Sequence, residues 1–424
     1  MDTIYDEERS SGEEVATGGS RSNYGYEKGQ DGLLKQSLMQ GKLISVIYPT
    51  KENLTNVYRI KESPLHLQEL QELSVITENS QSSRPYFPEL DGVRAIAALM
   101  VMAFHFCADK GVGGLALFGQ TGVDLFFVLS GFLITTILLQ SPEKDWHEIR
   151  TFYIRRTLRI FPLYYGYLIL AAFLGSVSSV WYWIYLQNIP MSMSVPMVGP
   201  GHFWSLAIEE QFYLVWPFLV LFLPRRWLTK TLWAIVALAL ISRMVLIPLN
   251  VSPFFFTLTR LDGLAGGALL AVYFQRRLIH SHRRLLLLLA LLSAAALCGQ
   301  WWKFHGQGLP WEQITKFTFT TCFYSSSVGY LVVSGPILAN RFLRSGPMRF
   351  IGRISYGLYV FHPAIFGFLL LRMQRTPTWI QLMTCFAATF AVSLCSWQLY
   401  ESRFVRLKDK LAPERKKFPA AMAA

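Results

Sequence analysis

The chain has 424 residues, of which 52% are hydrophobic, 15% aromatic and only 16% charged. Soluble domains of this length are less apolar, so the composition predicts an integral membrane protein. The formal charge of +13 could suggest a nucleic-acid-binding protein, but the basic residues form short clusters between apolar runs. That pattern is typical of membrane topology, so we expect the lipid bilayer as a partner and no nucleic acid.

The first part of the chain, residues 1–85, is polar and shows no sustained hydrophobic periodicity. Such a segment buries too little apolar surface to fold alone, which predicts a disordered cytoplasmic extension. A regulatory or partner-binding tail is the alternative. The first long apolar run begins near Val93, so we expect no signal peptide before it.

The rest of the chain holds about ten apolar segments, each close to the roughly 20 residues that a helix needs to cross a bilayer. They are 93–109, 120–140, 160–178, 203–223, 231–249, 256–275, 284–302, 313–334, 354–372 and 379–399. The aromatic segment 180–188 is expected to be re-entrant or interfacial. We therefore predict an all-α integral membrane protein, a bundle of about ten transmembrane helices.

The loops between these segments predict the orientation of the bundle. Loops on one side carry sixteen Lys and Arg side chains, and loops on the other side carry four. Because positively charged loops stay in the cytoplasm, both termini are expected there. We divide the chain into the extension 1–85, a transmembrane domain 86–405 and a basic cytoplasmic tail 406–424.

Several ionisable residues lie inside the predicted spans, where a charge costs about 2.5–3.5 kcal/mol at the bilayer centre. They are Arg94, His105, Asp124, Glu209, Glu210, Arg243, Arg260, Asp262 and His362. Such residues are candidates for a functional site, although those of opposite sign could equally form structural ion pairs.

The first span carries Arg94 and His105, eleven residues apart. At about 100° and 1.5 Å per residue, they lie on one helical stripe about 16 Å apart. With Arg94 at the cytoplasmic mouth, His105 lies halfway through the bilayer, where an imidazole can act as a general base. The alternative is a histidine that only hydrogen-bonds a neighbouring helix.

The fourth span contains Glu209 on the same helical face as Ser205 and Tyr213. A carboxylate there could orient an imidazolium, whereas Glu210 points about 100° away from that face and is the weaker candidate. In the second span, Asp124 and Gly131 share a face, and Gly131 would allow close helix approach.

Two further features have competing explanations. Ser130 could carry an acyl group, but its Ser-Gly-Phe sequence lacks the Gly-x-Ser-x-Gly elbow. Arg156 and Arg159 lie on one helical face just before the third span. They either anchor the span by the positive-inside rule or bind phosphate groups, to which paired guanidiniums are suited.

Six motifs together resemble the acyltransferase-3 family of integral membrane O-acyltransferases. They occur in the order ELDGVRAIAALMVMAFH, GVDLFFVLSGFLI, FYIRRTLRIFP, HFWSLAIEEQFYLVWP, RLDGLAGGALLA and ISYGLYVFHP, and they cover about 86–405. The resemblance implies a ten-helix bundle in a bacterial plasma (inner) membrane. It would be an acyltransferase of the class that transfers groups other than aminoacyl groups. The donor substrate would be cytoplasmic acyl-CoA, and the acyl group would move from it to a hydroxyl. The acceptor would be a sugar, a lipid-linked glycan or a surface polysaccharide, or a macrolide-like small molecule.

The resemblance also implies roles for individual residues. It makes His105 the catalytic histidine, Arg94 its arginine partner, and the Arg156 and Arg159 pair an essential cytoplasmic motif, and it matches Glu209 to a motif glutamate. We expect cytoplasmic arginines to hold the phosphates of the donor, with acetyl-CoA as the expected acyl-CoA, while His105, oriented by Glu209 or Asp124, deprotonates the acceptor. The motif residues Arg260, Asp262 and His362 are added as candidate substrate-binding residues. No metal and no permanently bound cofactor is expected.

The rival class is a polytopic transporter or flippase, whose intramembrane charges line a permeation route. A scaffold or sensor that uses the polar extension is a third possibility. The chain ends about twenty residues after the last predicted span, so we expect no hydrolase-like domain after the bundle.

Overall fold

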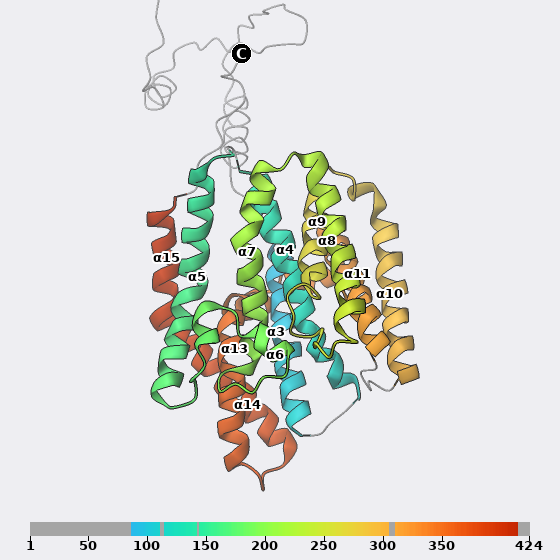
Figure 1. Ribbon diagram of the computed structural model, residues 1–424. Helices are drawn as coiled ribbons and strands as arrows, with labels where there is room; N and C mark the ends of the chain where they lie inside the picture. The colour runs from blue at the N-terminus through green and yellow to red at the C-terminus, as the bar shows by residue number, and fades with distance from the viewer. Residues whose placement is uncertain (1–85, 111–113, 142–143, 305–309, 414–424) are drawn as a thin grey trace, which may run out of the picture. The chain divides into compact units, whose positions relative to one another are not determined.

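The computed structural model describes residues 86–110, 114–141, 144–304 and 310–413. The predicted extension, residues 1–85, and the end of the predicted tail, residues 414–424, lie outside this part of the chain. Every regular element in the described ranges is helical and none is a strand, which confirms the all-α prediction (Figure 1).

Long helices make up most of the described chain. They are α3 (Pro88–Asp109), α4 (Gly122–Leu139), α5 (Trp146–Phe173), α7 (Trp204–Phe222), α8 (Arg225–Leu246), α9 (Leu261–Gln275), α10 (Arg283–Phe304), α11 (Pro310–Val333), α13 (Gly346–Arg372), α14 (Thr378–Ser396) and α15 (Ser402–Leu411). Shorter helical elements connect them: η1 (Gly114–Thr121), η2 (Val180–Ile184), α6 (Asn188–Ser192), η3 (Gly201–Phe203), η4 (His280–His282), α12 (Leu338–Leu343) and the π-helical turn η5 (Trp397–Glu401).

Seven helical segments among the described residues are long and apolar enough to cross a membrane. They are Pro88–Ala108, Phe118–Leu139, Gly201–Phe222, Arg225–Leu246, His280–Lys303, Gly346–Arg372 and Thr378–Leu411. The protein is therefore a multi-pass membrane protein. Each of the ten predicted segments overlaps one long helix, but α5, α9 and α11 do not meet the same standard, so the count of about ten stays a prediction.

Several predicted boundaries differ from the structure. Helix α5 begins at Trp146, where the Asp145 carboxylate caps it by accepting a hydrogen bond from the Glu148 amide. Arg156 and Arg159 thus lie inside the helix rather than just before it. Helix α9 begins at Leu261 rather than near 256, and the last helical run continues through η5 and α15 to Leu411.

The helices pack in identifiable pairs. Helix α3 lies against α13, α4 against α9, and α10 against α11 (Figure 1). Helix α10 leaves many of its leucines exposed, among them Leu285, Leu288, Leu291 and Leu292. A helix that exposes such apolar side chains is suited to contact with lipid.

Glycines let α4 and α9 approach closely. A Cβ atom at Gly131 would overlap the carbonyl oxygen of Leu264 on α9, and one at Gly267 would overlap the carbonyl oxygen of Val128 on α4. Both obstacles are backbone atoms, which cannot turn aside as a flexible side chain can. This arrangement confirms the prediction that Gly131 allows close helix approach.

Replacing Gly131 by alanine should destabilise the bundle by about 1–3 kcal/mol, because the added methyl group forces two tightly packed helices apart. Thermal unfolding of the purified protein in one detergent measures the effect. Gly299→Ala is the matched control, since nothing lies within 4 Å of a Cβ atom there. Equal melting temperatures for the two variants would contradict this account of the α4–α9 contact.

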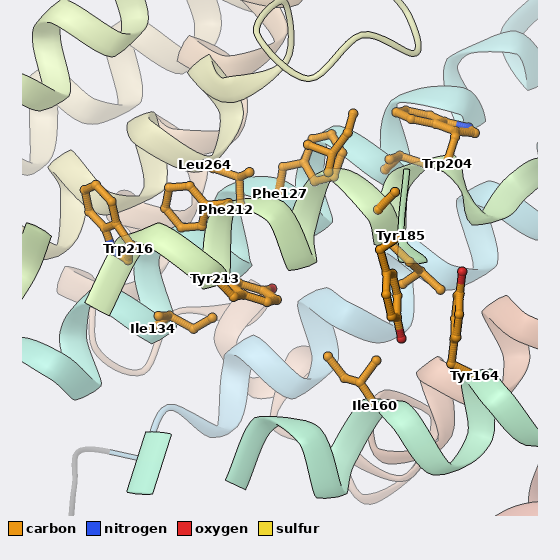
Figure 2. Close-up of a cluster of buried hydrophobic side chains, with 14 of the residues drawn as sticks. Phe127, Ile134, Ile160, Tyr164, Tyr185, Trp204, Phe212, Tyr213, Trp216 and Leu264 are labelled. Atoms are coloured by element: carbon orange, nitrogen blue, oxygen red, sulfur yellow. The ribbon is translucent and has the colours of Figure 1, made fainter. Parts of the chain in front are cut away.

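The largest apolar core lies between α4, α5, α7 and α9 (Figure 2). Within it, Phe212 stacks on Trp216 with 4.7 Å between ring centroids, and Tyr164 stacks on Tyr185 at 4.1 Å. The Trp216 indole N–H donates to Thr135 Oγ1 at 2.8 Å, which satisfies the one polar group of that ring. This core holds α7, with its polar residues, firmly against α4 and α5.

Candidate active site

Two histidines from distant parts of the sequence meet in the bundle. His105 lies near the end of α3 and His362 in the middle of α13, and His362 Nε2 is 3.1 Å from His105 Nδ1. Their ring centroids are 4.9 Å apart. The packing of α3 against α13 therefore brings together two of the predicted site residues.

The backbone contacts of the two rings assign their protons. His362 Nδ1 lies 3.0 Å from the Leu358 carbonyl oxygen, which can only accept a hydrogen bond, so this nitrogen carries the proton of the neutral ring. His362 Nε2 then accepts from His105 Nδ1–H, which also lies 2.9 Å from the Val101 carbonyl oxygen. In a neutral His105, Nε2 is consequently the nitrogen without a proton.

His105 lines a cavity of about 380 Å³, called here the histidine cavity. Its wall also includes His202, Trp204 and Tyr359. The His202 ring centroid is 5.5 Å from that of His362, and His202 Nε2 lies 3.1 Å from the Val360 carbonyl oxygen. Three imidazoles thus gather at this end of the bundle.

The arginines lie in a second region, nearer the start of α3. An outer hollow of about 430 Å³, the entrance cavity, has six basic side chains and two acidic ones in its wall. The basic ones are Arg94, Arg155, Arg156, Arg159, Arg353 and Lys408. The structure therefore brings Arg94 together with the Arg156 and Arg159 pair, and the excess of positive charge favours a polyanion.

A smaller hollow of about 120 Å³, the inner cavity, continues from the entrance cavity. The two share Arg94, Arg156 and Arg159 in their walls. Arg94 is held by Asp91, whose Oδ1 is 2.6 Å from Nη1 of the arginine. The position of Asp91, one turn before Arg94, is explained by this ion pair.

Glu209 lies in the wall of the inner cavity. Its Oε1 accepts a 2.6 Å hydrogen bond from Ser130, and its Oε2 is 4.0 Å from Nη2 of Arg156. The Arg156 guanidinium also lies over the Tyr213 ring, 3.9 Å from the centroid. The structure thus groups Glu209 with Arg156 and Ser130, while His362 hydrogen-bonds His105.

The inner cavity and the histidine cavity have Tyr359 and Val123 in common. The Tyr359 hydroxyl is 2.6 Å from Ser205 Oγ and donates to the His202 carbonyl oxygen. Tyr359 therefore stands at the boundary between the arginine-lined cavities and the histidine cavity.

Three other candidate residues take part in buried ion pairs. Asp124, predicted as a possible orienting carboxylate, accepts a 2.7 Å hydrogen bond from Arg260, and Asp262 pairs with Arg243 at 2.8 Å. Arg260 and Arg243 are almost fully buried, and the Arg260 guanidinium lies 3.9 Å from the Phe317 ring centroid. These contacts favour the structural alternative for Asp124, Arg260 and Asp262.

Breaking the Asp124–Arg260 pair should destabilise the protein by about 3–5 kcal/mol, because one charge is then buried without its partner. We expect Asp124→Leu to lower the melting temperature strongly and the double variant Asp124→Leu with Arg260→Met to regain most of it. The double variant should also keep acyl-transfer activity. A double variant that is stable but inactive would instead show that Asp124 or Arg260 takes part in catalysis.

Sequence reasoning passed over two residues of this site. His202 opens the HFWSL motif, and Tyr359 lies three residues before His362 in YVFHP. Each residue could have been found from the sequence. His202 is a further imidazole at the start of an apolar span, and Tyr359 is a tyrosine one helical turn from a candidate histidine.

Comparison with known proteins gives the family to which a chain with these residues belongs. A family model described as an acyltransferase domain matches residues 87–398, which is most of the described chain and includes every candidate residue. The chain belongs to this acyltransferase family. No solved structure matches it.

Several curated relatives are similar to this acyltransferase-family chain. The peptidoglycan O-acetyltransferase OatA of Listeria monocytogenes is 29% identical over 367 residues, which are 76% of this chain and 56% of the relative. The O-acetyltransferase OatA of Staphylococcus aureus is 29% identical over 67% of this chain and 51% of its own length. The putative peptidoglycan O-acetyltransferase YrhL of Bacillus subtilis is 29% identical over 65% and 48%. The chain spans about half the length of these relatives.

Proposed function

We propose that this protein is a membrane O-acyltransferase that moves an acyl group, in the simplest case acetyl, from acyl-CoA to a hydroxyl of a glycan. The names of the relatives support acetyl as the group and a polysaccharide as the acceptor. The observation that carries the proposal is the meeting of the arginine-lined cavities with the histidine cavity at Tyr359. Neighbouring cavities that share Tyr359 would then bring donor and acceptor close together in the bundle.

The donor would enter from the arginine side. Coenzyme A is a polyanion, and the entrance cavity holds six basic side chains against two acidic ones. Paired guanidiniums can bind phosphate oxygens in a bidentate manner. Because positively charged loops favour the cytoplasm, we place this end of the bundle, and both chain termini, on the cytoplasmic side of the bacterial plasma membrane. Glu209 and Tyr213 would hold the Arg156 guanidinium in position for the phosphates.

The reaction would take place where the acyl arm passes Tyr359 and reaches His105. His105 Nε2, the nitrogen without a proton, takes the proton of the acceptor hydroxyl while the hydroxyl oxygen attacks the thioester carbonyl carbon. As the tetrahedral intermediate collapses, the carbon–sulfur bond breaks and the coenzyme A thiolate leaves with the proton from the imidazolium. An ester and free coenzyme A are the products, and no metal ion is required for this balance.

His362 would act as a positioning residue, in the place that sequence reasoning gave to Glu209 or Asp124. It accepts the hydrogen bond from His105 Nδ1–H and so keeps the proton away from Nε2, as the carboxylate does in hydrolase triads. A neutral hydrogen-bond acceptor is suited to this position, because His362 is fully buried and a charged group would be costly there.

Replacing His362 by phenylalanine should lower kcat about 10–100-fold with little change in the KM for acyl-CoA, because the acceptor that fixes the His105 tautomer is lost. His362→Gln keeps a hydrogen-bond acceptor and should retain more activity than the phenylalanine variant. Steady-state kinetics with both variants measures the difference. Equal kcat values for the two variants, or a loss confined to KM, would contradict the positioning role.

The function can be tested in cells by mass spectrometry of extracted glycans and small metabolites, with and without the gene. The proposal expects a mass difference of one acyl group on a glycan, which returns when the wild-type gene is restored but not with His105→Asn. An acyl group missing only from a small metabolite would contradict the glycan acceptor, and unchanged masses throughout would contradict acyl transfer.

A further inference from the structure

One cavity in the described part of the chain takes no part in the mechanism above. It measures about 540 Å³ and lies between α3, η1, α10 and α11, at the end of the bundle where α3 finishes. Its wall combines aromatic and polar side chains, among them Phe118, Gln300, Trp301, Glu312, Lys316 and Tyr324. We call it the lateral cavity, and its volume is in the range of small-molecule binding sites.

Three residues that line this cavity each carry one buried polar atom without a hydrogen-bond partner among the described residues. These atoms are Gln300 Oε1, the Trp301 indole Nε1–H and Glu312 Oε2. Glu312 is only 5% exposed, so its carboxylate is a costly group to leave unsatisfied. Two acceptors and one donor on the residues of one cavity wall match a ligand that both donates and accepts hydrogen bonds, as a sugar hydroxyl does.

The charge in the wall of this cavity differs from that in the walls of the arginine-lined cavities. Glu312 and Lys316 lie one helical turn apart on α11 and contribute opposite charges to the wall. The balance favours a neutral ligand, in contrast to the entrance cavity, which favours a polyanion. The aromatic side chains, including Phe118 and Trp301 with ring centroids 6.0 Å apart, offer flat apolar faces to the C–H side of a sugar ring.

The lateral cavity also adjoins the reaction site. Phe104 and Gln120 belong to the walls of both the lateral cavity and the histidine cavity. Phe104 precedes His105 on α3, and their ring centroids are 5.2 Å apart. A ligand in the lateral cavity would therefore lie beside Phe104 and Gln120, the residues that also line the histidine cavity.

We infer that the lateral cavity binds the acceptor, as a neutral sugar ring whose hydroxyl groups pair with Gln300, Trp301 and Glu312. The inference rests on the proposed function and adds to it a second binding site, which shares no wall residue with the arginine-lined cavities. Donor and acceptor would thus enter by separate cavities and meet at the histidine.

Sugar binding can be measured without any reaction. Saturation-transfer NMR on the full-length protein in lipid nanodiscs, titrated with N,N′-diacetylchitobiose as the probe, gives its Kd. We expect Trp301→Phe and Glu312→Gln each to raise this Kd about 5–20-fold, the factor expected for a lost hydrogen bond to a buried site. Trp301→Phe keeps an aromatic ring and removes only the indole donor, so it also serves if Glu312→Gln folds poorly.

The control is Trp302→Phe, because Trp302 follows Trp301 on α10 but is 77% exposed. It should leave the Kd of the sugar unchanged, and all three variants should bind coenzyme A as the wild type does. Wild-type affinity in Trp301→Phe and Glu312→Gln, or an equal loss in Trp302→Phe, would overturn the inference. Binding of octanol without any binding of the sugar would also overturn the inference, because a pocket for lipid tails would behave in this way. Sugar binding that depends on Trp301 in a protein without acyl transfer would overturn the proposed function and leave the sugar site standing.

Discussion

Replacing His105 by asparagine should lower kcat for acyl transfer by about 10²–10⁴-fold, the factor that a general base contributes. Asparagine can still donate a hydrogen bond near the position of Nδ1, but it has no basic nitrogen in the position of Nε2. The KM for acyl-CoA should change little, because the arginines of the entrance cavity, rather than His105, are assigned to the donor. Steady-state kinetics on the purified variant, reconstituted like the wild type, measures both constants.

The matched control for this prediction is His280→Asn, which replaces an exposed histidine outside the site. It should transfer acyl groups at the wild-type rate. A His105→Asn protein that inserts normally and keeps the wild-type kcat would contradict the assignment of the base. In that case His105 would be a histidine that only joins α3 to α13 through its hydrogen bonds.

The second large effect concerns the donor. The double variant Arg156→Ala with Arg159→Ala should raise the Kd of coenzyme A by about 10²–10³-fold, because two charge-assisted contacts to phosphate are lost. Binding of a sugar probe should not change. Isothermal titration with coenzyme A in nanodiscs measures the first quantity, and NMR with N,N′-diacetylchitobiose measures the second.

Two controls sharpen the arginine experiment. Arg150→Ala removes an exposed arginine from the same helix and should leave coenzyme A binding unchanged. Lysines at 156 and 159 keep the charge but lose bidentate geometry, so their Kd should fall between those of the wild type and the alanine variant. If the alanine variant binds coenzyme A with wild-type affinity, both arginines only set the membrane topology and do not bind the donor.

Much of the fold could be predicted from the sequence, because hydrophobic runs of spanning length are visible one helix at a time. The same local reasoning explains the link between Asp91 and Arg94, which lie three residues apart on one helix. It also placed Arg94 and His105 on one stripe of α3. The start of α5 was missed because its first half is polar and charged, so a hydropathy pattern begins too late there.

The partners of the site residues could not be predicted, because helical periodicity gives the face of a side chain but not which helix lies opposite. His105 and His362 are separated by 257 residues, and Asp124 and Arg260 by 136. Sequence reasoning therefore offered Asp124 as a partner for His105, although the packing of α4 against α9 gives its carboxylate to Arg260. A pairing of this kind becomes visible only once the helices are placed side by side.

Acyl transfer can be followed in one assay on the purified protein in nanodiscs, supplied with acetyl-CoA labelled in the acetyl group and with a soluble glycan. We expect label to appear in the glycan as an alkali-labile ester, free coenzyme A to be released in equal amount, and both to stop in His105→Asn. A protein that neither cleaves the thioester nor labels the glycan, while binding coenzyme A no better than its Arg156→Ala with Arg159→Ala variant, would contradict the account and favour a transporter or flippase.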